Sequence, residues 1–297
     1  MSSVMGVVEE TGFQAALGLM RRFGAARASD LGGAIAVSIG TRLPVSKVAD
    51  ANLAHAFPAL DAAARRQIIR DVWENIGRTM GELPHLAKLE RTSSGPGWEI
   101  AGEDILRDQS ARGGPAIFFS AHIGNWEMLP RILAHAGIPM ASFYRALSNV
   151  RVNEAVNRLR RDAAGLDLPM FPKGAQGASG ALAHLAGGGY LGILADQKMN
   201  DGIPVEFFGR PAMTAPALAA LALRFGCPVI PGRVRRTGSA RLRLEVEPPL
   251  PLPQTGDRQA DIATLMRAVN RTFERWITDE PGSWLWLHRR WPKEAAN

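Results

Sequence analysis

The residues best suited to chemistry lie in the segment Ala121–Glu127, directly after an apolar run. His122 carries an imidazole, whose ordinary pKa lets it accept a proton near neutral pH. Glu127 follows five positions later, and a carboxylate on the far ring nitrogen fixes the tautomer of an imidazole and stabilises its protonated form. The pair is therefore a candidate general-base dyad. The alternative is a hydrogen-bonded turn residue followed by an acid in the first turn of a helix, since this spacing occurs by chance in many chains.

The elements around this segment would place His122 at the rim of a sheet. The apolar run Pro115–Phe119 predicts a buried strand and Asn125–Ala136 predicts a helix, so His122 lies in the connecting turn. Turns of this kind carry chemistry in open α/β folds. Gly124 permits close backbone approach, and free N–H groups at a helix start can hold an oxyanion.

Strand and helix signals alternate after the Ser93–Gly97 break. The predicted strands are Pro115–Ser120, Met140–Tyr144, Tyr190–Ala195, Val205–Phe207, Val229–Val234 and Arg241–Val246. The predicted helices between and after them include Val150–Ala164, Gly177–Ala186, Pro216–Phe225 and Asp261–Thr278. We therefore expect an α/β fold with a mixed, largely parallel sheet flanked by helices.

The first part of the chain has a different pattern. Residues up to about Leu89 look helical, and Ala62–Met80 has the best amphipathic periodicity. We expect an N-terminal helical region, residues 1–90, that associates with a membrane and packs on an α/β core, residues 91–297. The two parts are expected to form one structural domain, because no low-complexity linker divides the 297 residues.

The composition of the chain limits the classes of molecule that the protein is expected to bind. A formal net charge of +7 suggests an anionic partner, but neither an RNA-binding sheet motif nor a helix-turn-helix signature occurs, so we expect no nucleic acid. The single cysteine, Cys227, lies between apolar residues and is interpreted as a small buried hydrophobe. No group of histidines, cysteines and acids has the spacing of metal ligands, so no metal is expected.

The sequence predicts no transmembrane span. The apolar stretches Thr11–Met20 and Leu31–Thr41 are shorter than the roughly 20 residues that a span requires. Phe13, Leu17 and Met20 lie at helical spacing, so the first helix either lies in the headgroup plane or docks on the domain as a surface helix. No signal peptide is apparent, which predicts a location in the cytoplasm or on its membrane face.

Several blocks of the chain resemble the lipid A biosynthesis acyltransferases, the lauroyl and myristoyl transferases within the glycerolipid acyltransferase superfamily. The segment His122–Glu127 resembles their motif of a histidine, four residues and an acid, in the form that contains Asn-Trp-Glu. Further matching blocks, in the family's order, are Asn52-Leu53 with Ala56–Pro58, Asn75–Arg78, Tyr144-Arg145 with Asn149, Asp196–Lys198, Val205–Gly209 with Thr214, and Trp284–Trp291. The resemblance covers nearly the whole chain, although the long apolar N-terminal helix common in this family has no clean equivalent.

The resemblance implies a direct acyl transfer. His122, held by Glu127, would take the proton from an acceptor hydroxyl as that oxygen attacks an acyl thioester, with backbone N–H groups or a cation at the oxyanion. The implied donor is an acyl carrier protein, with coenzyme A as the alternative carrier, and no other cofactor is expected. The implied acceptor is an anionic saccharolipid, a Kdo-bearing lipid A precursor, at the cytoplasmic face of the bacterial inner membrane, where the protein would be peripheral or monotopic.

Other residues are expected to bind the substrates. Gly124, Asn125 and Trp126 belong to the motif, and Trp126 and Phe208 are candidates to line an acyl groove, although core packing explains both nearly as well. The resemblance marks Asp196 and Gln197, which follow a strand, as site residues, with Asp196 ordering a basic group or the acceptor sugar. Candidates to grip phosphate are Arg145, Arg161 and Lys173. Arg158 and Arg160 are interpreted as a solvated helix face, and Arg289 and Arg290 either lie at the headgroup level or pack with the terminal tryptophans on the core.

Three alternatives stay open. The same dyad could serve a lysophospholipid or another membrane lipid as acceptor. Water could replace the alcohol, which would make the protein a hydrolase, although the absence of a Gly-x-Ser-x-Gly elbow counts against a serine nucleophile. A non-catalytic binder of anionic membranes would tolerate the loss of His122.

Overall fold

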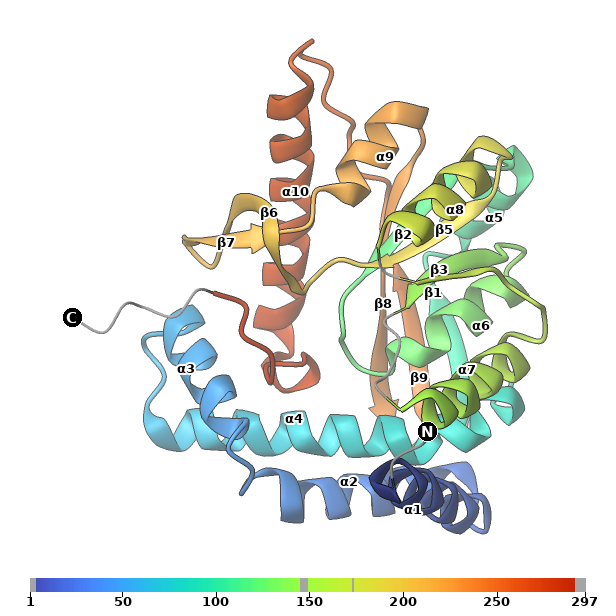
Figure 1. Cartoon of the computed structure of the whole chain (residues 1–297), viewed down its shortest axis with the longest axis vertical. Helices are drawn as coiled ribbons and strands as arrows, with labels where there is room; N and C mark the ends of the chain where they lie inside the picture. Colours follow the sequence, from blue (N-terminus) through green and yellow to red (C-terminus); the bar gives the residue numbers. More distant parts are fainter. Residues whose placement is uncertain (1–3, 145–148, 173, 292–297) are drawn as a thin grey trace.

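A computed structural model of the chain describes residues 4–144, 149–172 and 174–291. Within these ranges a seven-stranded sheet has the order β1-β9-β8-β2-β5-β3-β4 (Figure 1). Its strands are β1 (Gly97–Ala101), β2 (Ala116–Ser120), β3 (Met140–Tyr144), β4 (Met170–Pro172), β5 (Tyr190–Leu194), β8 (Val229–Gly238) and β9 (Arg241–Val246). Neighbouring strands are parallel except for β8 and β9, which are antiparallel. The predicted α/β class with a mixed, largely parallel sheet is confirmed.

Helices cover both faces of the sheet, and the side chains of β2 show how. Ile117 and Phe119 point into one apolar cluster, with side chains of α8 (Ala175–Ala186), α9 (Ala217–Phe225) and α10 (Arg258–Asp279). Ala116 and Phe118 point into the other cluster, with side chains of α5 (Glu103–Arg112), α6 (Leu129–His135) and α7 (Val150–Ala164). All five residues of β2 are buried, as expected for a central strand covered on both faces.

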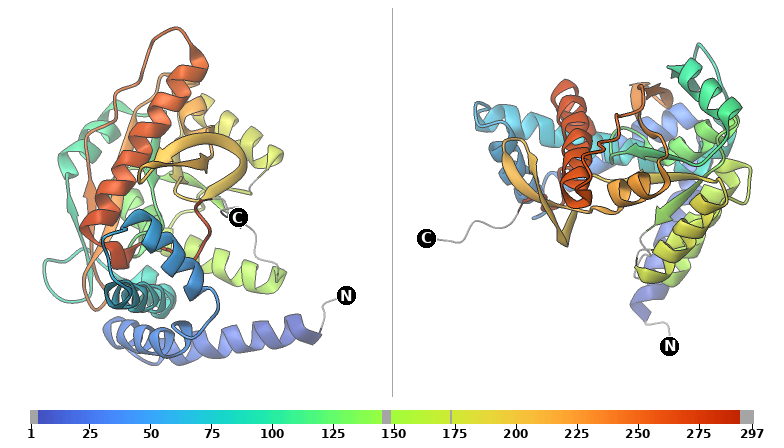
Figure 2. Two further views of the ribbon diagram at one scale, coloured as in Figure 1. Left: turned by 90° about the vertical axis from the view of Figure 1, so that its left-hand side faces the viewer. Right: turned by 90° about the horizontal axis from the view of Figure 1, so that it is seen from above.

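The N-terminal helices form a layer at one end of the sheet, and α1 and α2 lie at its outer side (Figure 2, left). The layer consists of α1 (Val4–Arg21), α2 (Ala25–Gly40), α3 (Ser46–Ala56) and α4 (Ala62–Glu82), followed by the 3-10 helix η1 (Leu83–Lys88). Helices α2 and α4 pack through glycines: a Cβ on Gly32 would lie 2.3 Å from the Gly77 carbonyl oxygen, and one on Gly81 would lie 2.1 Å from that of Ala28. Their backbones therefore approach more closely than side chains would permit.

No helix within the described ranges joins the length to the apolar character that crossing a bilayer takes. Phe13, Leu17 and Met20 of α1 line a small cavity together with residues of α2 and α4, whereas Leu19 of the same helix is 44% exposed. The apolar residues that do face solvent on this layer include Ile35, Ile39 and Leu43.

Two local predictions are corrected. The predicted strand Val205–Phe207 is real but lies outside the main sheet, because it belongs to β6 (Lys198–Phe207), which pairs only with β7 (Arg210–Thr214) in a separate antiparallel hairpin. The predicted helix Asn125–Ala136 is split: the 3-10 turn η2 (Trp126–Met128) precedes α6, and the Asn125 side chain caps η2 by accepting from the Glu127 N–H. The strands β1, β4 and β7 were not predicted.

Candidate active site

Two neighbouring parallel strands deliver the central residues of the site. Strands β2 and β5 pair in a register that places Ser120 beside Leu194. Two residues beyond this pair, the segment after β2 reaches His122 and the segment after β5 reaches Asp196. Because the carboxyl ends of parallel strands lie at the same edge of a sheet, these two side chains meet there, where α/β folds bind their ligands.

The Asp196 carboxylate binds both the imidazole ring and the backbone N–H of His122. The Nδ1 of His122 lies 2.8 Å from Oδ1 of Asp196, and the His122 backbone N–H donates to Oδ2 at 3.1 Å. The Trp284 indole N–H also donates to Oδ2, at 2.8 Å, and the carboxylate is fully buried. Burial alone would raise the pKa of Asp196, but the charge of His122 and its hydrogen bonds hold that pKa well below the usual range. The carboxylate therefore stays ionised and sets Nδ1 of His122 as the protonated nitrogen.

The other ring nitrogen of His122 is available for chemistry. It makes no hydrogen bond with any residue in the described ranges, and the side chain keeps 18% of its surface exposed. Trp126 packs edge-on against the imidazole, with ring centroids 5.2 Å apart. With Nδ1 carrying a proton toward Asp196, Nε2 is an acceptor that faces the surface, which is the arrangement of a general base.

The predicted pairing of His122 with Glu127 is not the one that the structure contains. Both carboxylate oxygens of Glu127 bind Arg160 on α7, at 2.6 and 2.7 Å, in a two-pronged ion pair. The Glu127 side chain is only 8% exposed. The interpretation of Arg160 as part of a solvated helix face is wrong, because its guanidinium forms an ion pair with Glu127, the acid of the motif. Local spacing favoured Glu127 as the partner of His122, whereas the strand register supplies Asp196.

The turn between these residues is tightly built. Gly124 has a φ of 56°, in the left-handed region, and a Cβ there would lie 1.9 Å from the Val234 carbonyl oxygen, so only glycine fits. Its N–H donates to the Ser283 carbonyl at 3.1 Å. Asn125 is fully buried and donates from Nδ2 to Glu82 at 2.6 Å. Gly124 and Asn125 therefore shape the turn through contacts within the protein.

Residues 13–293 match the model of the bacterial lipid A biosynthesis acyltransferases. The chain belongs to this family. No curated protein matches it closely enough to add a relative. Membership in the family makes the protein an acyltransferase of lipid A biosynthesis in general terms.

The structure places the remaining predicted site residues of this acyltransferase in different surroundings. Gln197 lies half-buried in the bend after Asp196. Phe208 packs among aromatic rings, including those of Phe57, Phe207 and Trp291. Arg161 is exposed on α7. Arg145 and Lys173 lie outside the described residues.

The C-terminal segment Trp284–Trp291 closes one side of the site. The indole rings of Trp284 and Trp286 are fully buried, and so is Arg290, which donates to the Met213 carbonyl at 3.0 Å and to Thr214 Oγ1 at 2.8 Å. Burial lowers the pKa of Arg290 to about 10, although the nearby Asp196 charge opposes the shift. Of the two locations considered for this segment, packing on the core holds for Arg290 and the tryptophans.

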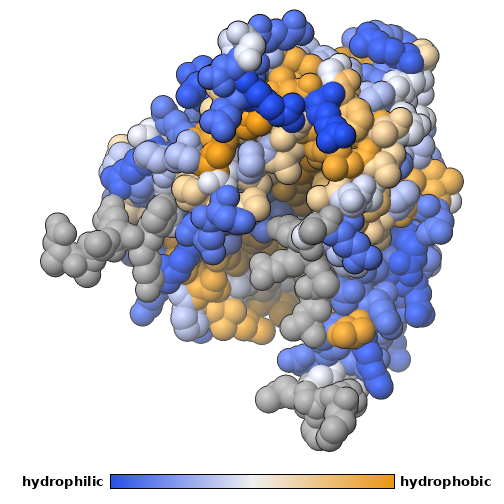
Figure 3. All heavy atoms as spheres, turned by 45° about the horizontal axis from the view of Figure 1, so that its top comes forward, coloured by the Kyte–Doolittle hydropathy of each residue, from blue (hydrophilic) through white to orange (hydrophobic). Residues whose placement is uncertain are grey.

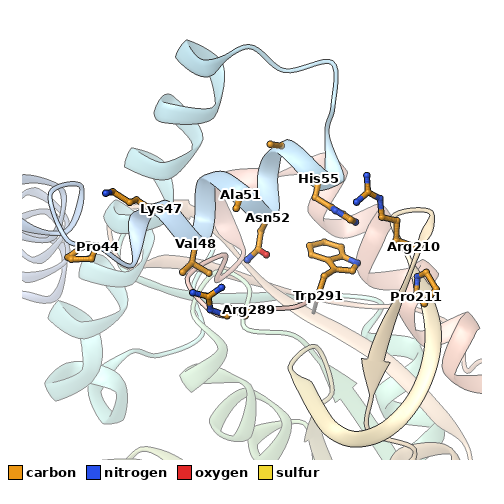
Figure 4. A pocket seen from close by; sticks show the side chains of 11 residues that line it. Pro44, Lys47, Val48, Ala51, Asn52, His55, Arg210, Pro211, Arg289 and Trp291 are labelled. Carbon is orange, nitrogen blue, oxygen red and sulfur yellow. The ribbon is translucent and has the colours of Figure 1, made fainter. Parts of the chain in front are cut away.

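Arg289 of this segment is exposed and, together with Trp291, lines a pocket of about 850 Å³ between α3 and the β6–β7 hairpin (Figure 4). Lys47 and Arg210 also line this pocket, and no acid does so among its described lining residues. A second hollow is visible near the centre of the face in Figure 3, with apolar residues gathered on its upper walls and polar residues at its rim. The acyltransferase surface thus offers both cationic and apolar concavities.

Two further findings concern metals and thiols. Within the described ranges, no three or more His, Cys, Asp or Glu side chains are grouped so that they could hold a metal ion. Cys227 is buried just before β8, and burial raises the pKa of its thiol to about 11. The thiol therefore remains protonated at neutral pH.

Three residues support the site through partners that the sequence did not reveal: Arg160 with Glu127, Trp284 with Asp196, and Glu82 with Asn125. Their partners are 33, 88 and 43 positions away respectively, so no local spacing reveals them.

Proposed function

We propose that this acyltransferase moves a fatty acyl chain from an acyl carrier protein thioester to a hydroxyl of a Kdo-bearing lipid A precursor, with His122 as general base. The observation that carries the proposal is the pairing of His122 Nδ1 with the buried carboxylate of Asp196 at 2.8 Å, which leaves Nε2 as an exposed proton acceptor. Asp196 takes the orienting role that the sequence had given to Glu127.

The transfer needs no covalent acyl-enzyme. Nε2 of His122 removes the proton of the acceptor hydroxyl while its oxygen attacks the thioester carbonyl, and the buried Asp196 carboxylate stabilises the imidazolium that forms. Collapse of the tetrahedral intermediate breaks the C–S bond, and the leaving thiolate takes the proton back from Nε2. The new ester and the free carrier thiol leave His122 in its starting state.

The developing oxyanion requires a donor or a cation. The Gly124 N–H is already occupied by the Ser283 carbonyl, so this group of the turn is not available. Arg160 is the cation that the motif itself anchors, through the two-pronged ion pair with Glu127. We assign to Glu127 the role of holding Arg160 toward the reacting carbonyl or an acceptor phosphate, which gives the motif acid a function without contact to His122.

Charge and surface support the proposed substrates. The net charge of +7 favours both an acidic carrier protein and a phosphate-bearing saccharolipid. The pocket lined by Lys47, Arg210 and Arg289 offers a further cationic surface. The apolar hollow in Figure 3 is a surface on which an acyl chain could lie.

A peripheral attachment to the cytoplasmic face of the inner membrane is part of the proposal. Ile35, Ile39 and Leu43 recur every four residues along α2 and its C-terminal end, and they are 41%, 57% and 41% exposed. The four-residue spacing places Ile35 and Ile39 on one side of α2, which ends at Gly40, and Leu43 lies in the turn that follows. Arg42 lies beside them, and an apolar stripe with a neighbouring cation is typical of helices that lie in the headgroup region.

The test is transfer of a labelled acyl group from acyl carrier protein, or from coenzyme A in a parallel reaction, to a Kdo-bearing tetraacylated lipid A precursor. The wild-type protein is compared with His122→Ala, Glu127→Ala and Asp196→Asn, each shown to be folded by circular dichroism. Lysophospholipid vesicles serve as the alternative acceptor, and free fatty acid is measured to detect hydrolysis.

We expect product from the wild type and almost none from His122→Ala, with a loss in Glu127→Ala that reflects the released Arg160. Free fatty acid in place of product would support a hydrolase instead. Transfer only to lysophospholipid would replace the acceptor but keep the mechanism. Undiminished product from His122→Ala would refute the proposed base.

A further inference from the structure

Helix α4 buries a polar stripe where an apolar one would be more stable. Asn75, Thr79 and Glu82 are spaced by four and three positions, so they lie on one face of the helix. They are 9%, 0% and 0% exposed. Buried polar groups are costly unless each finds a partner, so their partners show what the stripe does.

All three side chains bind the turn that carries His122. Asn75 Nδ2 donates to the Gly124 carbonyl at 3.0 Å, and Thr79 Oγ1 donates to the same oxygen at 3.2 Å. Glu82 Oε2 accepts from Asn125 Nδ2 at 2.6 Å. The stripe therefore grips the two residues that lie two and three positions after the base.

Arg236, on β8, joins the stripe into one network. It donates to Asn75 Oδ1 at 3.3 Å and to Thr79 Oγ1 at 3.2 Å, and it forms an ion pair with Oε1 of Glu82. The Ser29 hydroxyl of α2 donates to the same Oε1 at 2.6 Å. The arginine side chain is 13% exposed and the glutamate side chain is fully buried, so the two charges compensate each other inside the protein.

The carboxylate also decides which way the Asn125 amide points. Because Nδ2 donates to Glu82, Oδ1 faces the other way and accepts from the Glu127 N–H at 3.2 Å. This bond begins the 3-10 turn that places Glu127 against Arg160. One buried acid on the helical layer thus sets the orientation of the residues on the far side of His122.

We propose that Glu82, supported by Arg236, is a positioning residue for the general base: it holds the His122–Glu127 turn in its reactive geometry through Asn125. The inference rests on the proposed function and deepens it. A base must be held within about 0.5 Å of its productive position, and residues locked by a surrounding hydrogen-bond network achieve this. Through these hydrogen bonds, the helical layer that faces the membrane in our proposal would be connected directly to the catalytic turn.

The sharpest variant is Glu82→Gln. Oε1 accepts from both Ser29 and Arg236, so the remaining oxygen of an amide takes that place and its NH₂ group faces the NH₂ of Asn125. Asn125 then flips, and its Nδ2 meets the Glu127 N–H, which removes the cap of η2. We expect kcat to fall by about tenfold or more, with KM for the acyl donor within about twofold of the wild type.

The double variant Glu82→Gln with Asn125→Asp exchanges acid and amide. The new carboxylate accepts from the glutamine NH₂ on one side and from the Glu127 N–H on the other, so the bond between positions 82 and 125 forms again with its direction reversed and the cap of η2 is restored. We expect kcat to recover to within about threefold of the wild type. A loss of stability without loss of positioning would show no such rescue.

Glu245→Gln is the matched control. It weakens two other ion pairs of β8, those of Glu245 with the 8% exposed Arg233 and with Arg235. The other partners of these arginines are Trp276, Asp279 and Glu280 rather than residues of the turn. We expect a comparable loss of stability with an unchanged kcat. If Glu82→Gln fails to fold, Thr79→Val, which is nearly isosteric and removes one bond to Gly124, tests the same link and should lower kcat by about twofold to fivefold.

Two results would overturn the inference. The first is a kcat of Glu82→Gln, or of Thr79→Val where that variant is needed, equal to the kcat of Glu245→Gln. The second is a double variant that is no more active than Glu82→Gln alone. His122→Ala is measured beside them to separate the two proposals. If His122→Ala is inactive while Glu82→Gln is fully active, the positioning role fails and the proposed base stands. If His122→Ala is active, the base itself is refuted.

Discussion

Replacing Asp196 by asparagine should inactivate the enzyme through the tautomer of His122. Two donors converge on Oδ2 of Asp196, the backbone N–H of His122 and the indole N–H of Trp284. The oxygen of an asparagine must therefore stay at this position. Its NH₂ group then takes the place of Oδ1 and donates to Nδ1 of His122, which forces the ring proton onto Nε2. An Nε2 that already carries a proton cannot accept one from the acceptor hydroxyl.

The size of the effect follows from the loss of the reactive tautomer. The same change in the catalytic triad of serine proteases lowers kcat by about ten-thousandfold with the geometry intact. That factor corresponds to about 5 kcal/mol in the activation free energy. We expect Asp196→Asn to lower kcat by about a thousandfold to ten-thousandfold, with KM nearly unchanged, because Asp196 is fully buried and touches no substrate in the proposed mechanism.

The assay is single-turnover acyl transfer at saturating donor and acceptor, with folding checked by thermal denaturation. Asp261→Asn is the control, since Asp261 is another buried acid, 7% exposed, whose carboxylate caps a turn by accepting from Thr255. It should keep the wild-type rate. A folded Asp196→Asn variant with a kcat within tenfold of the wild type would refute the assignment of Asp196 as the residue that orients the base.

Three further outcomes are expected. Gly124→Ala should lower the free energy of unfolding by at least about 2 kcal/mol in urea titrations, because its Cβ would lie 1.9 Å from the Val234 carbonyl; wild-type stability would contradict this. Burial lowers the pKa of His288, so the folded protein takes up that proton less readily than the unfolded chain, and stability should fall as the pH drops below about 6.5; His288→Gln should reduce this fall between pH 7.5 and 5.5, and equal slopes would contradict it. Cys227, with its raised pKa of about 11, should resist iodoacetamide at pH 8 until urea unfolds the chain, and rapid labelling of the native protein would contradict its burial.

The strands of the site could be predicted, but their pairing could not. The apolar runs at Ala116–Ser120 and Tyr190–Leu194 are short, uncharged and followed by polar residues, so both strands and the positions of His122 and Asp196 beyond them were predicted. Which strands become neighbours depends on the packing of the whole sheet. Asp196 lies 74 positions from His122, and only the pairing of β2 with β5 brings the two together.

The same limit explains the other differences. Hydrophobic periodicity predicted helix α4, yet Met80 at the end of the amphipathic stretch is 43% exposed, whereas Thr79 and Glu82 are fully buried. Periodicity assumes that buried means apolar, so it misses a helix face whose polar groups are satisfied by a distant arginine. The hairpin β6–β7 was missed in part because β7 begins Arg-Pro, which is unfavourable for a central strand and acceptable in a two-stranded one.

The indole on Asp196 has a consequence for the order in which the enzyme becomes active. Trp284 lies 88 positions after Asp196 in the chain. The ribosome synthesises the chain from its amino end, so the sheet can form before Trp284, a partner of the catalytic carboxylate, has been synthesised. A growing chain would thus carry a histidine and an acid in place but with the carboxylate still lacking one of its donors. Synthesis of the segment that carries Trp284, rather than formation of the sheet, would be the event that completes the partners of the catalytic carboxylate.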